Sequence, residues 1–133
     1  IEVVWSLADN LPAILADPVK LEQVFINLLI NARDAIVKQA ESESNPMQIH
    51  IGTALQQGLL TITFADTGTG IPEQMIDKIF EPFFTTKEVG KGTGLGLSIT
   101  YGIIKESGGN ISVSNNRYGG ATFTLTFQIQ EEG

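Results

Sequence analysis

Cysteine is absent from this chain, and basic residues are scarce. The 133 residues contain no cysteine, one histidine, and eight lysines and arginines against fifteen acidic residues. The absence of cysteine excludes a disulfide framework and a thiolate metal site, and it suits a reducing compartment. A formal net charge of −7 leaves too few cations for a broad face that follows nucleic-acid phosphates, so we expect no nucleic-acid partner. An anionic ligand must therefore be held by a few local groups.

Long apolar runs are lacking as well. No stretch approaches the roughly 18 apolar residues of a membrane-spanning helix. The first residues carry none of the basic character that opens a signal peptide. With 42% hydrophobic residues and neither a repeat nor an evident linker, the composition is that of a folded chain. We expect one soluble domain over residues 1–133.

The hydrophobic pattern predicts strands and helices in mixed order. Alternating apolar residues predict strands at 1–7, 47–51, 60–64, 111–113 and 123–129. A Gln-Gln-Gly turn joins the second strand to the third, and residues 116–120 turn between the last two. Because helices and strands do not alternate one by one, a purely parallel βαβ arrangement is excluded.

Three helices are predicted between these strands. Asp17 is a candidate N-cap, with Pro18 at the first helical position of a long amphipathic helix that continues to Ile36. A short helix is predicted at 72–80 and a third at 95–107, ended by Gly108 and Gly109. The polar segment 41–46 and the glycine-containing segment 81–94 are predicted loops, and the second is long enough to be functional.

One face of the long helix carries a row of polar residues. Gln23, Asn27, Asn31 and Asp34 follow each other at steps of four, four and three, so they share a face. Such a row is also the pattern of an ordinary solvated helix face. From spacing alone, both interpretations stay open.

Two further segments carry conformational and chemical signals. Asp66-Thr67-Gly68-Thr69-Gly70-Ile71-Pro72 follows a predicted strand, where an Asx-type turn is the simplest interpretation. Gly90-Lys91-Gly92-Thr93-Gly94-Leu95-Gly96-Leu97-Ser98 opens the third helix and is neither a Walker A loop nor a dinucleotide fingerprint. Its glycines allow close approach of the backbone to phosphates, which the helix N-terminus also favours.

Taken together, these segments resemble the boxes of the superfamily of gyrase, heat-shock chaperone, histidine kinase and MutL ATP-binding domains. Residues 21–36, LEQVFINLLINARDAI, resemble the N box, and Asp66–Pro72 resembles the first glycine box. Ile79–Phe84 resembles the F box, Gly90–Ser98 the second glycine box and Gly119–Phe123 the last. The resemblance implies an α+β two-layer sandwich, with a mixed, mostly antiparallel sheet of about five strands. Three helices would cover one face, and a flexible ATP lid would lie at about 81–94.

The resemblance also implies roles for individual residues. Asn31, assisted by Asn27, would bind Mg²⁺ on the ATP phosphates, and Asp66 would accept a hydrogen bond from the adenine amino group. Lys87 would take part in catalysis, and for this residue and Lys91 a solvated lysine is the alternative. The remaining residues expected to contact the nucleotide are Asp34, Gly68, Gly70, Ile71, Phe80, Lys91, Gly92, Thr93, Gly94, Leu95, Gly96, Leu97 and Thr122.

Asn27 decides between branches of the superfamily. Members that hydrolyse ATP carry a glutamate at this position as general base, and an amide cannot take that proton. The chain therefore resembles the catalytic domain of sensor histidine kinases, in particular those for nitrogen and oxygen responses or hybrid sensors. A hydrolysing ATPase, a serine kinase and a degenerate nucleotide-sensing module are the alternatives.

The histidine-kinase resemblance implies partners that lie outside this sequence. The phosphoacceptor would be a histidine on a separate dimerisation domain, and a response regulator would follow it. His50, on a predicted strand, is expected to be a bystander. We expect the full-length protein to be a homodimer, with this domain monomeric and cytoplasmic even if the sensor is anchored in a membrane.

Overall fold

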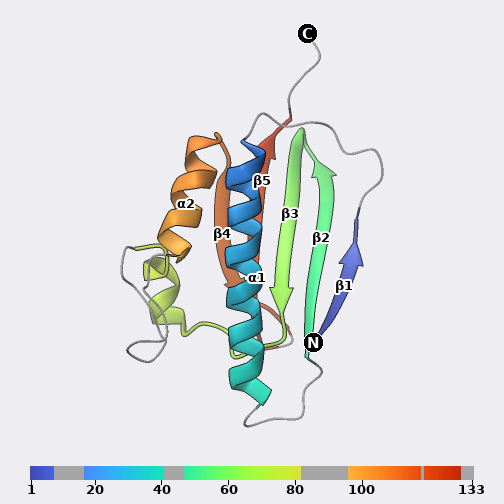
Figure 1. Ribbon diagram of the computed structural model, residues 1–133, viewed down its shortest axis with the longest axis vertical. Coiled ribbons are helices and arrows are strands. Elements are labelled where there is room, and N and C mark those ends of the chain that lie inside the picture. Colours follow the sequence, from blue (N-terminus) through green and yellow to red (C-terminus); the bar gives the residue numbers. More distant parts are fainter. Residues whose placement is uncertain (8–16, 41–46, 82–95, 118, 130–133) are drawn as a thin grey trace.

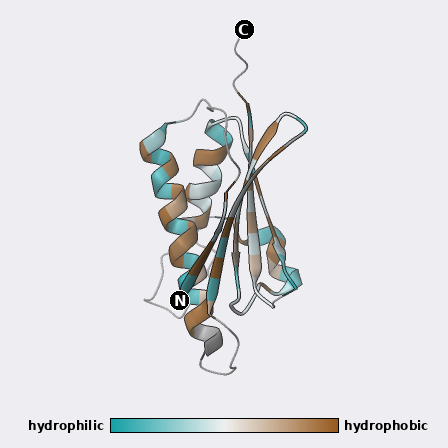
Figure 2. Ribbon diagram, turned by 90° about the vertical axis from the view of Figure 1, so that its right-hand side faces the viewer, coloured by the Kyte–Doolittle hydropathy of each residue, from teal (hydrophilic) through white to brown (hydrophobic). Residues whose placement is uncertain are grey.

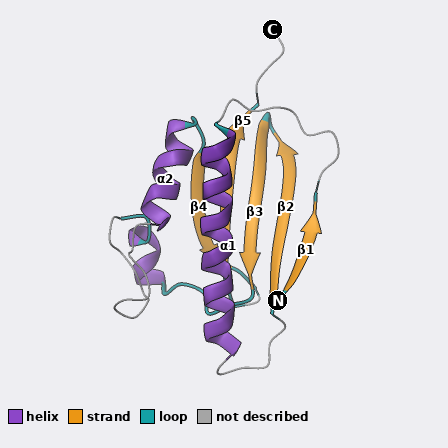
Figure 3. Cartoon of the chain, viewed as in Figure 1, coloured by secondary structure: helices purple, strands orange, loops and turns teal. Residues whose placement is uncertain are grey.

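The computed structural model describes residues 1–7, 17–40, 47–81, 96–117 and 119–129. Figure 3 shows its elements, which follow in the order β1 (Glu2–Ser6), α1 (Pro18–Ala40), β2 (Gln48–Gln56), β3 (Leu59–Asp66), the 3-10 helix η1 (Glu73–Lys78), α2 (Gly96–Glu106), β4 (Asn110–Asn115) and β5 (Ala121–Gln128). The predicted strands and the two longer helices are confirmed. The short helix predicted at 72–80 is present as a 3-10 helix, a form common in runs this short. The predicted loop at 41–46 and nearly all of the predicted lid lie outside the described residues.

The sheet is mixed, as predicted. Its strand order is β1-β2-β3-β5-β4, and only the β1–β2 pair is parallel. A parallel pair needs a crossover connection, and α1 supplies it between β1 and β2. β2 and β3 form a two-residue hairpin in which Gln57 (φ 53°) and Gly58 (φ 77°) both have positive φ, as a type I′ turn requires.

Both α-helices lie on the same side of this sheet. Figure 1 shows α1 and α2 side by side across its face, and the view turned by 90° in Figure 2 shows the two layers edge-on. The opposite face is lined by threonines that pair across β3 and β5, Thr61 with Thr126 and Thr63 with Thr124. The architecture is therefore the predicted two-layer sandwich with one covered face.

Local chemistry fixes where the helices begin and end. At the start of α1, Asp17 Oδ1 accepts hydrogen bonds from the N–H of Val19 (2.9 Å) and of Lys20 (3.4 Å), which confirms the predicted N-cap. At the end of α2, the Gly109 N–H donates to Ile104 O and the Gly108 N–H to Lys105 O. Gly108 has φ 76°, so the pattern is a Schellman motif with its left-handed residue at the predicted glycine.

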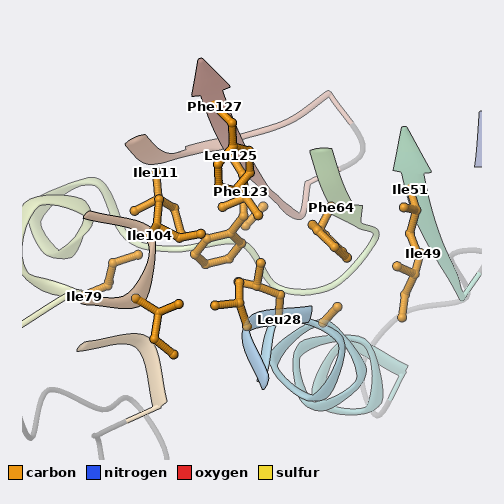
Figure 4. Packing of buried hydrophobic residues seen from close by; sticks show 14 of the residues in the cluster. Leu28, Ile49, Ile51, Phe64, Ile79, Ile104, Ile111, Phe123, Leu125 and Phe127 are labelled. Atoms are coloured by element: carbon orange, nitrogen blue, oxygen red, sulfur yellow. The ribbon is translucent and has the colours of Figure 1, made fainter. Parts of the chain in front are cut away.

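The core lies between the helices and the sheet. Figure 4 shows Leu28 of α1 and Ile104 of α2 near Phe123 and Leu125 of β5, and Leu28, Ile104 and Leu125 are at most 1% exposed. β1 contributes less than its apolar pattern suggests, because it is the edge strand. Val3 and Trp5 pair with the buried Ile49 and Ile51, yet Trp5 is 62% exposed.

Candidate functional site

Asp66 is the last residue of β3 and carries a buried carboxylate. The residue is 4% exposed, and its Oδ1 accepts the N–H of Gly68 at 2.9 Å and the N–H of Ala121 at 3.3 Å. Burial raises the pKa of this carboxyl above its ordinary value, and the two backbone hydrogen bonds oppose that shift. Both N–H groups bind Oδ1, and within the described part of the chain no group donates to Oδ2. This oxygen is therefore ready to accept a hydrogen bond from a ligand.

The loop after Asp66 is held between α1, β2 and the turn from β4 to β5. A Cβ on Gly68 would lie 2.6 Å from the backbone of Ala35, so the loop passes against α1 with no room for a side chain. Thr67 is buried, and its Oγ1 accepts the Gln48 N–H at 3.0 Å. Gly70 has φ 70°, and a Cβ there would lie 2.6 Å from Gly119 O. These contacts explain why Gly68 and Gly70 stand at these positions: the first lacks room, and the second needs a left-handed backbone.

The predicted polar face of α1 turns towards α2. Asn27 is half-buried, and its Nδ2 donates to Oγ1 of the fully buried Thr100 at 3.4 Å. Asn31 lies one turn further along and is half-buried, and its side chain makes no hydrogen bond with any residue that the structure describes. This face is consequently not merely a solvated surface, because one of its amides joins the two helices.

Asp34 forms an ion pair with its neighbour Arg33. Its Oδ1 accepts hydrogen bonds from Arg33 Nε at 3.3 Å and Nη2 at 3.1 Å. The two side chains are 36% and 58% exposed, so this ion pair contributes little to stability. The structure thus ties Asp34 to its neighbour at the edge of the site, and its predicted contact with the nucleotide stays a prediction.

Phe80 and Leu97 support the site from the core. The ring of Phe80 lies 5.5 Å from the Tyr101 ring of α2 and 6.3 Å, edge-on, from the Phe123 ring of β5. Leu97, next to the first residue of α2, Gly96, packs against the buried cluster. These contacts fix the positions of the two residues that border the predicted lid.

Thr122 lies on the other side of the sheet. It pairs with Ala65 in the β3–β5 register, whereas Asp66 follows Ala65 and points to the opposite face. On β5, the residue whose N–H reaches the Asp66 carboxylate is Ala121. The structure does not bring the side chains of Thr122 and Asp66 together, and the predicted contact of Thr122 with the base stays a prediction.

Several predicted site residues cannot be placed. Lys87, Lys91, Gly92, Thr93, Gly94 and Leu95 lie outside the described residues. His50 lies on β2 as predicted, where it is half-buried, with its Nε2 3.1 Å from Gln48 Oε1.

Sequence patterns did not single out three residues that shape the site. They are Thr100, Asn115 and Asn116. Asn115 clamps the loop, because its Oδ1 accepts the Ile71 N–H at 2.8 Å and its Nδ2 donates to Ile71 O at 2.7 Å. Asn116 Nδ2 donates to Asp66 O at 3.0 Å. In the sequence both asparagines look like ordinary turn residues, so only the fold reveals these contacts.

The residues present fit a magnesium ion that is shared with phosphates. Among the described residues, no three of His, Cys, Asp or Glu cluster closely enough to hold a metal by themselves. The amide oxygen of Asn31 is a hard, neutral ligand of the kind that Mg²⁺ accepts beside phosphate oxygens and water. Asn27 is one helical turn away and can supply a second oxygen.

Comparisons with known proteins show which families the chain is similar to. The family model described as histidine kinase-, DNA gyrase B-, and HSP90-like ATPase matches residues 16–131. Sensor kinase CckA from Brucella abortus (strain 2308) is 44% identical over 118 residues, which cover 83% of this chain and 12% of that protein. Sensor histidine kinase ZraS from Escherichia coli (strain K12) is 39% identical over 130 residues, covering 97% of this chain and 26% of that protein.

A solved structure has the same fold. The catalytic domain of the histidine kinase ThkA aligns with a TM-score of 0.80 and 32% identity, covering 98% of this chain and 81% of that one. The chain spans about a quarter or less of the two curated relatives, so it corresponds to one region of them. As for membrane insertion, neither α1 nor α2, nor any other described helix, has the length and hydropathy that a span requires.

Proposed function

The chain belongs to the family of histidine kinase-, DNA gyrase B- and HSP90-like ATPases, as the catalytic domain of a sensor histidine kinase, and we propose that it binds Mg-ATP at the Asp66 end of its sheet. In this proposal it donates the γ-phosphoryl group to a histidine of a separate dimerisation domain, from which a response regulator then receives it. The observation that carries the proposal is the buried Asp66 carboxylate, whose Oδ1 is fixed by two N–H groups while Oδ2 remains for the base.

Asp66 selects adenine by hydrogen-bond polarity. The exocyclic amino group of adenine donates, and the carboxylate can only accept when it is ionised. Guanine presents a carbonyl oxygen at the same place, so a guanine base would leave a buried charge unpaired and face it with a second acceptor. The fixed position of Oδ1 keeps Oδ2 from turning away from the ligand.

Asn31 and Asn27 would hold magnesium through their amide oxygens. When bound, the ion neutralises phosphate charge and orients the phosphates. The bond from Asn27 Nδ2 to Thr100 Oγ1 holds this amide against α2. The glycine-rich segment 90–96, Lys87 and Lys91, with the start of α2, are proposed to contact the phosphates.

An amide at position 27 accounts for transfer in place of hydrolysis. Asn27 cannot accept a proton from an attacking water at neutral pH, so the phosphoryl group is retained until a histidine is presented. The whole protein is proposed to act as a cytoplasmic-facing homodimer, with this domain itself monomeric. Catalysis then consists chiefly of positioning and charge stabilisation.

Replacement of Asn31 tests the phosphotransfer proposal. Asn31→Ala should abolish transfer from Mg-ATP to a supplied dimerisation domain. Its effect on the affinity for ATP should be much smaller than its effect on transfer, because Asp66 and the base contacts remain. Transfer would be followed with radiolabelled ATP and affinity by calorimetry. The matched control is Val37→Ala, which changes an exposed side chain of the same helix outside the proposed metal site.

Two outcomes would contradict the proposal. Full transfer by the Asn31→Ala variant would remove Asn31 from the metal site. Steady phosphate release by the unmodified domain alone would favour a hydrolysing ATPase, because no acceptor histidine would then be needed.

A further inference from the structure

Asn116 links the end of β3 to the start of β5 with one side chain. Its Nδ2 donates to Asp66 O at 3.0 Å and to Thr122 Oγ1 at 3.2 Å, and its Oδ1 accepts the Gly120 N–H at 3.2 Å. Its own backbone N–H donates to Gly120 O at 2.8 Å. The residue is half-buried, and it belongs to the turn between β4 and β5, fifty residues from Asp66 in the sequence.

The partners of Asn116 determine which way its amide points. The backbone oxygen of Asp66 can only accept, and the N–H of Gly120 can only donate. Both requirements are met in one orientation of the amide, and exchanging its oxygen and nitrogen would break both bonds. The NH₂ group therefore faces β3 and the oxygen faces the start of β5.

This orientation connects Asn116 to the carboxylate of Asp66. Gly120 is buried and lies so close to Asp66 that a Cβ on it would overlap the Asp66 backbone oxygen. The next residue, Ala121, supplies one of the two N–H groups that bind Asp66 Oδ1. Asn116 thus fixes the backbone on both sides of that hydrogen bond: Asp66 through its carbonyl and Ala121 through Gly120.

We propose that Asn116 is a positioning residue for base selection, which holds β3 and β5 in place so that Asp66 Oδ2 faces the base. The inference rests on the proposed function, because it assigns a support to the same site. Asn116 touches neither the base nor the phosphates in this account and acts only through Asp66.

Asn115 provides a matched control from the neighbouring position. It also makes two side-chain hydrogen bonds to the loop, but both go to Ile71, five residues beyond Asp66. Its side chain makes none with Asp66, Gly120 or Ala121. If both asparagines only stabilise the fold, replacing either one should have the same effect on the preference for ATP over GTP. If Asn116 positions Asp66 for the base, only its replacement should lower that preference.

The test compares the dissociation constants for Mg-ATP and Mg-GTP, with Tm measured in parallel. Asn116→Ala should weaken ATP binding roughly two- to tenfold, the effect of about one hydrogen bond, with little change for GTP. The preference for ATP over GTP should therefore fall by the same factor. Asn115→Ala should lower Tm comparably and keep the preference.

A second variant guards against an unfolded Asn116→Ala protein. Asn116→Asp keeps the shape and the acceptor for the Gly120 N–H but loses both donors, so it should lose the preference as well. An unchanged preference in a folded Asn116→Ala or Asn116→Asp protein would overturn the inference, and so would an equal loss in Asn115→Ala. Asp66→Ala belongs in the same series. If this variant binds ATP as tightly as the wild type does, the proposed function fails. If Asp66→Ala weakens ATP binding but the Asn116 variants keep the preference for ATP over GTP, only this inference is refuted.

Discussion

The carboxylate of Asp66 is buried with two backbone N–H groups as its partners, and it has no ion pair within the described residues. Burial disfavours the charged form, so the pKa of this group is raised. A raised pKa means that the folded protein holds this proton more tightly than the unfolded chain does. Asp66 therefore favours folding only when it is protonated, and its charge opposes folding at neutral pH.

Asp66→Asn should accordingly raise Tm at pH 7 and weaken ATP binding. The amide keeps an oxygen for the N–H groups of Gly68 and Ala121 but carries no buried charge. Each 1 kcal/mol gained corresponds to roughly 2–8 °C in a domain of about this size. The charge of the wild-type carboxylate lowers the free energy of unfolding as the pH rises from the ordinary pKa of 3.8 through the raised pKa of the folded state. Above the raised pKa this loss has reached its full size.

Thermal unfolding of both proteins between pH 3 and pH 8 checks this expectation. The difference in Tm should be largest near neutral pH and should shrink as the pH falls towards 3.8, where the wild-type carboxyl becomes protonated in both states. A variant that is less stable than the wild type at pH 7 would show that the charge stabilises the fold and would contradict the account.

At the scale of elements, the pocket depends on close backbone approach at a strand end. The loop after β3 meets the start of β5 where Gly120 leaves no space for a side chain next to Asp66. A second glycine, Gly102 in the interior of α2, has an ordinary φ, and a Cβ added to it would meet no atom within 4 Å. Gly120 is therefore required because a side chain would not fit there, whereas Gly102 can be replaced.

Alanine substitutions at these glycines should have opposite effects. Gly120→Ala should destabilise the domain by about 3 kcal/mol or more, at the upper end for overpacking, because the Asp66 backbone cannot move freely. Gly102→Ala should stabilise it by about 0.5–1 kcal/mol, because alanine is favoured in a helix interior. Denaturant unfolding measures both, and a stabilising Gly120→Ala would show that the two strands approach each other less closely than the structure indicates.

For the whole molecule, local signals predicted most of the fold. Asp17 and Gly108 marked helix ends through chemistry that acts over a few residues, and strand alternation predicted the five strands. Two features were not predictable from local patterns. The exposure of Trp5 follows from the edge position of β1. The sequence predicted a helix at η1 but did not specify its 3-10 form.

The site was predicted less completely than the fold, for a related reason. Asp66, Asn27 and Asn31 stand within recognisable boxes, so their sequence neighbours indicated them. Asn115 and Asn116 act through contacts with residues 44 and 50 positions away, and these contacts exist only once β3, β4 and β5 have paired. The side of the sheet on which Thr122 lies was likewise set by strand register, which no box reveals.

The central claim is that this end of the sheet selects adenine through Asp66, and paired titrations test it most directly. Calorimetry of the wild-type domain should show tighter binding of Mg-ATP than of Mg-GTP, and Asp66→Ala should weaken ATP binding by roughly 1.5–3 kcal/mol, or about ten- to a hundredfold. Equal affinities of the wild-type domain for the two nucleotides, or an Asp66→Ala variant that binds ATP as the wild type does, would contradict the account.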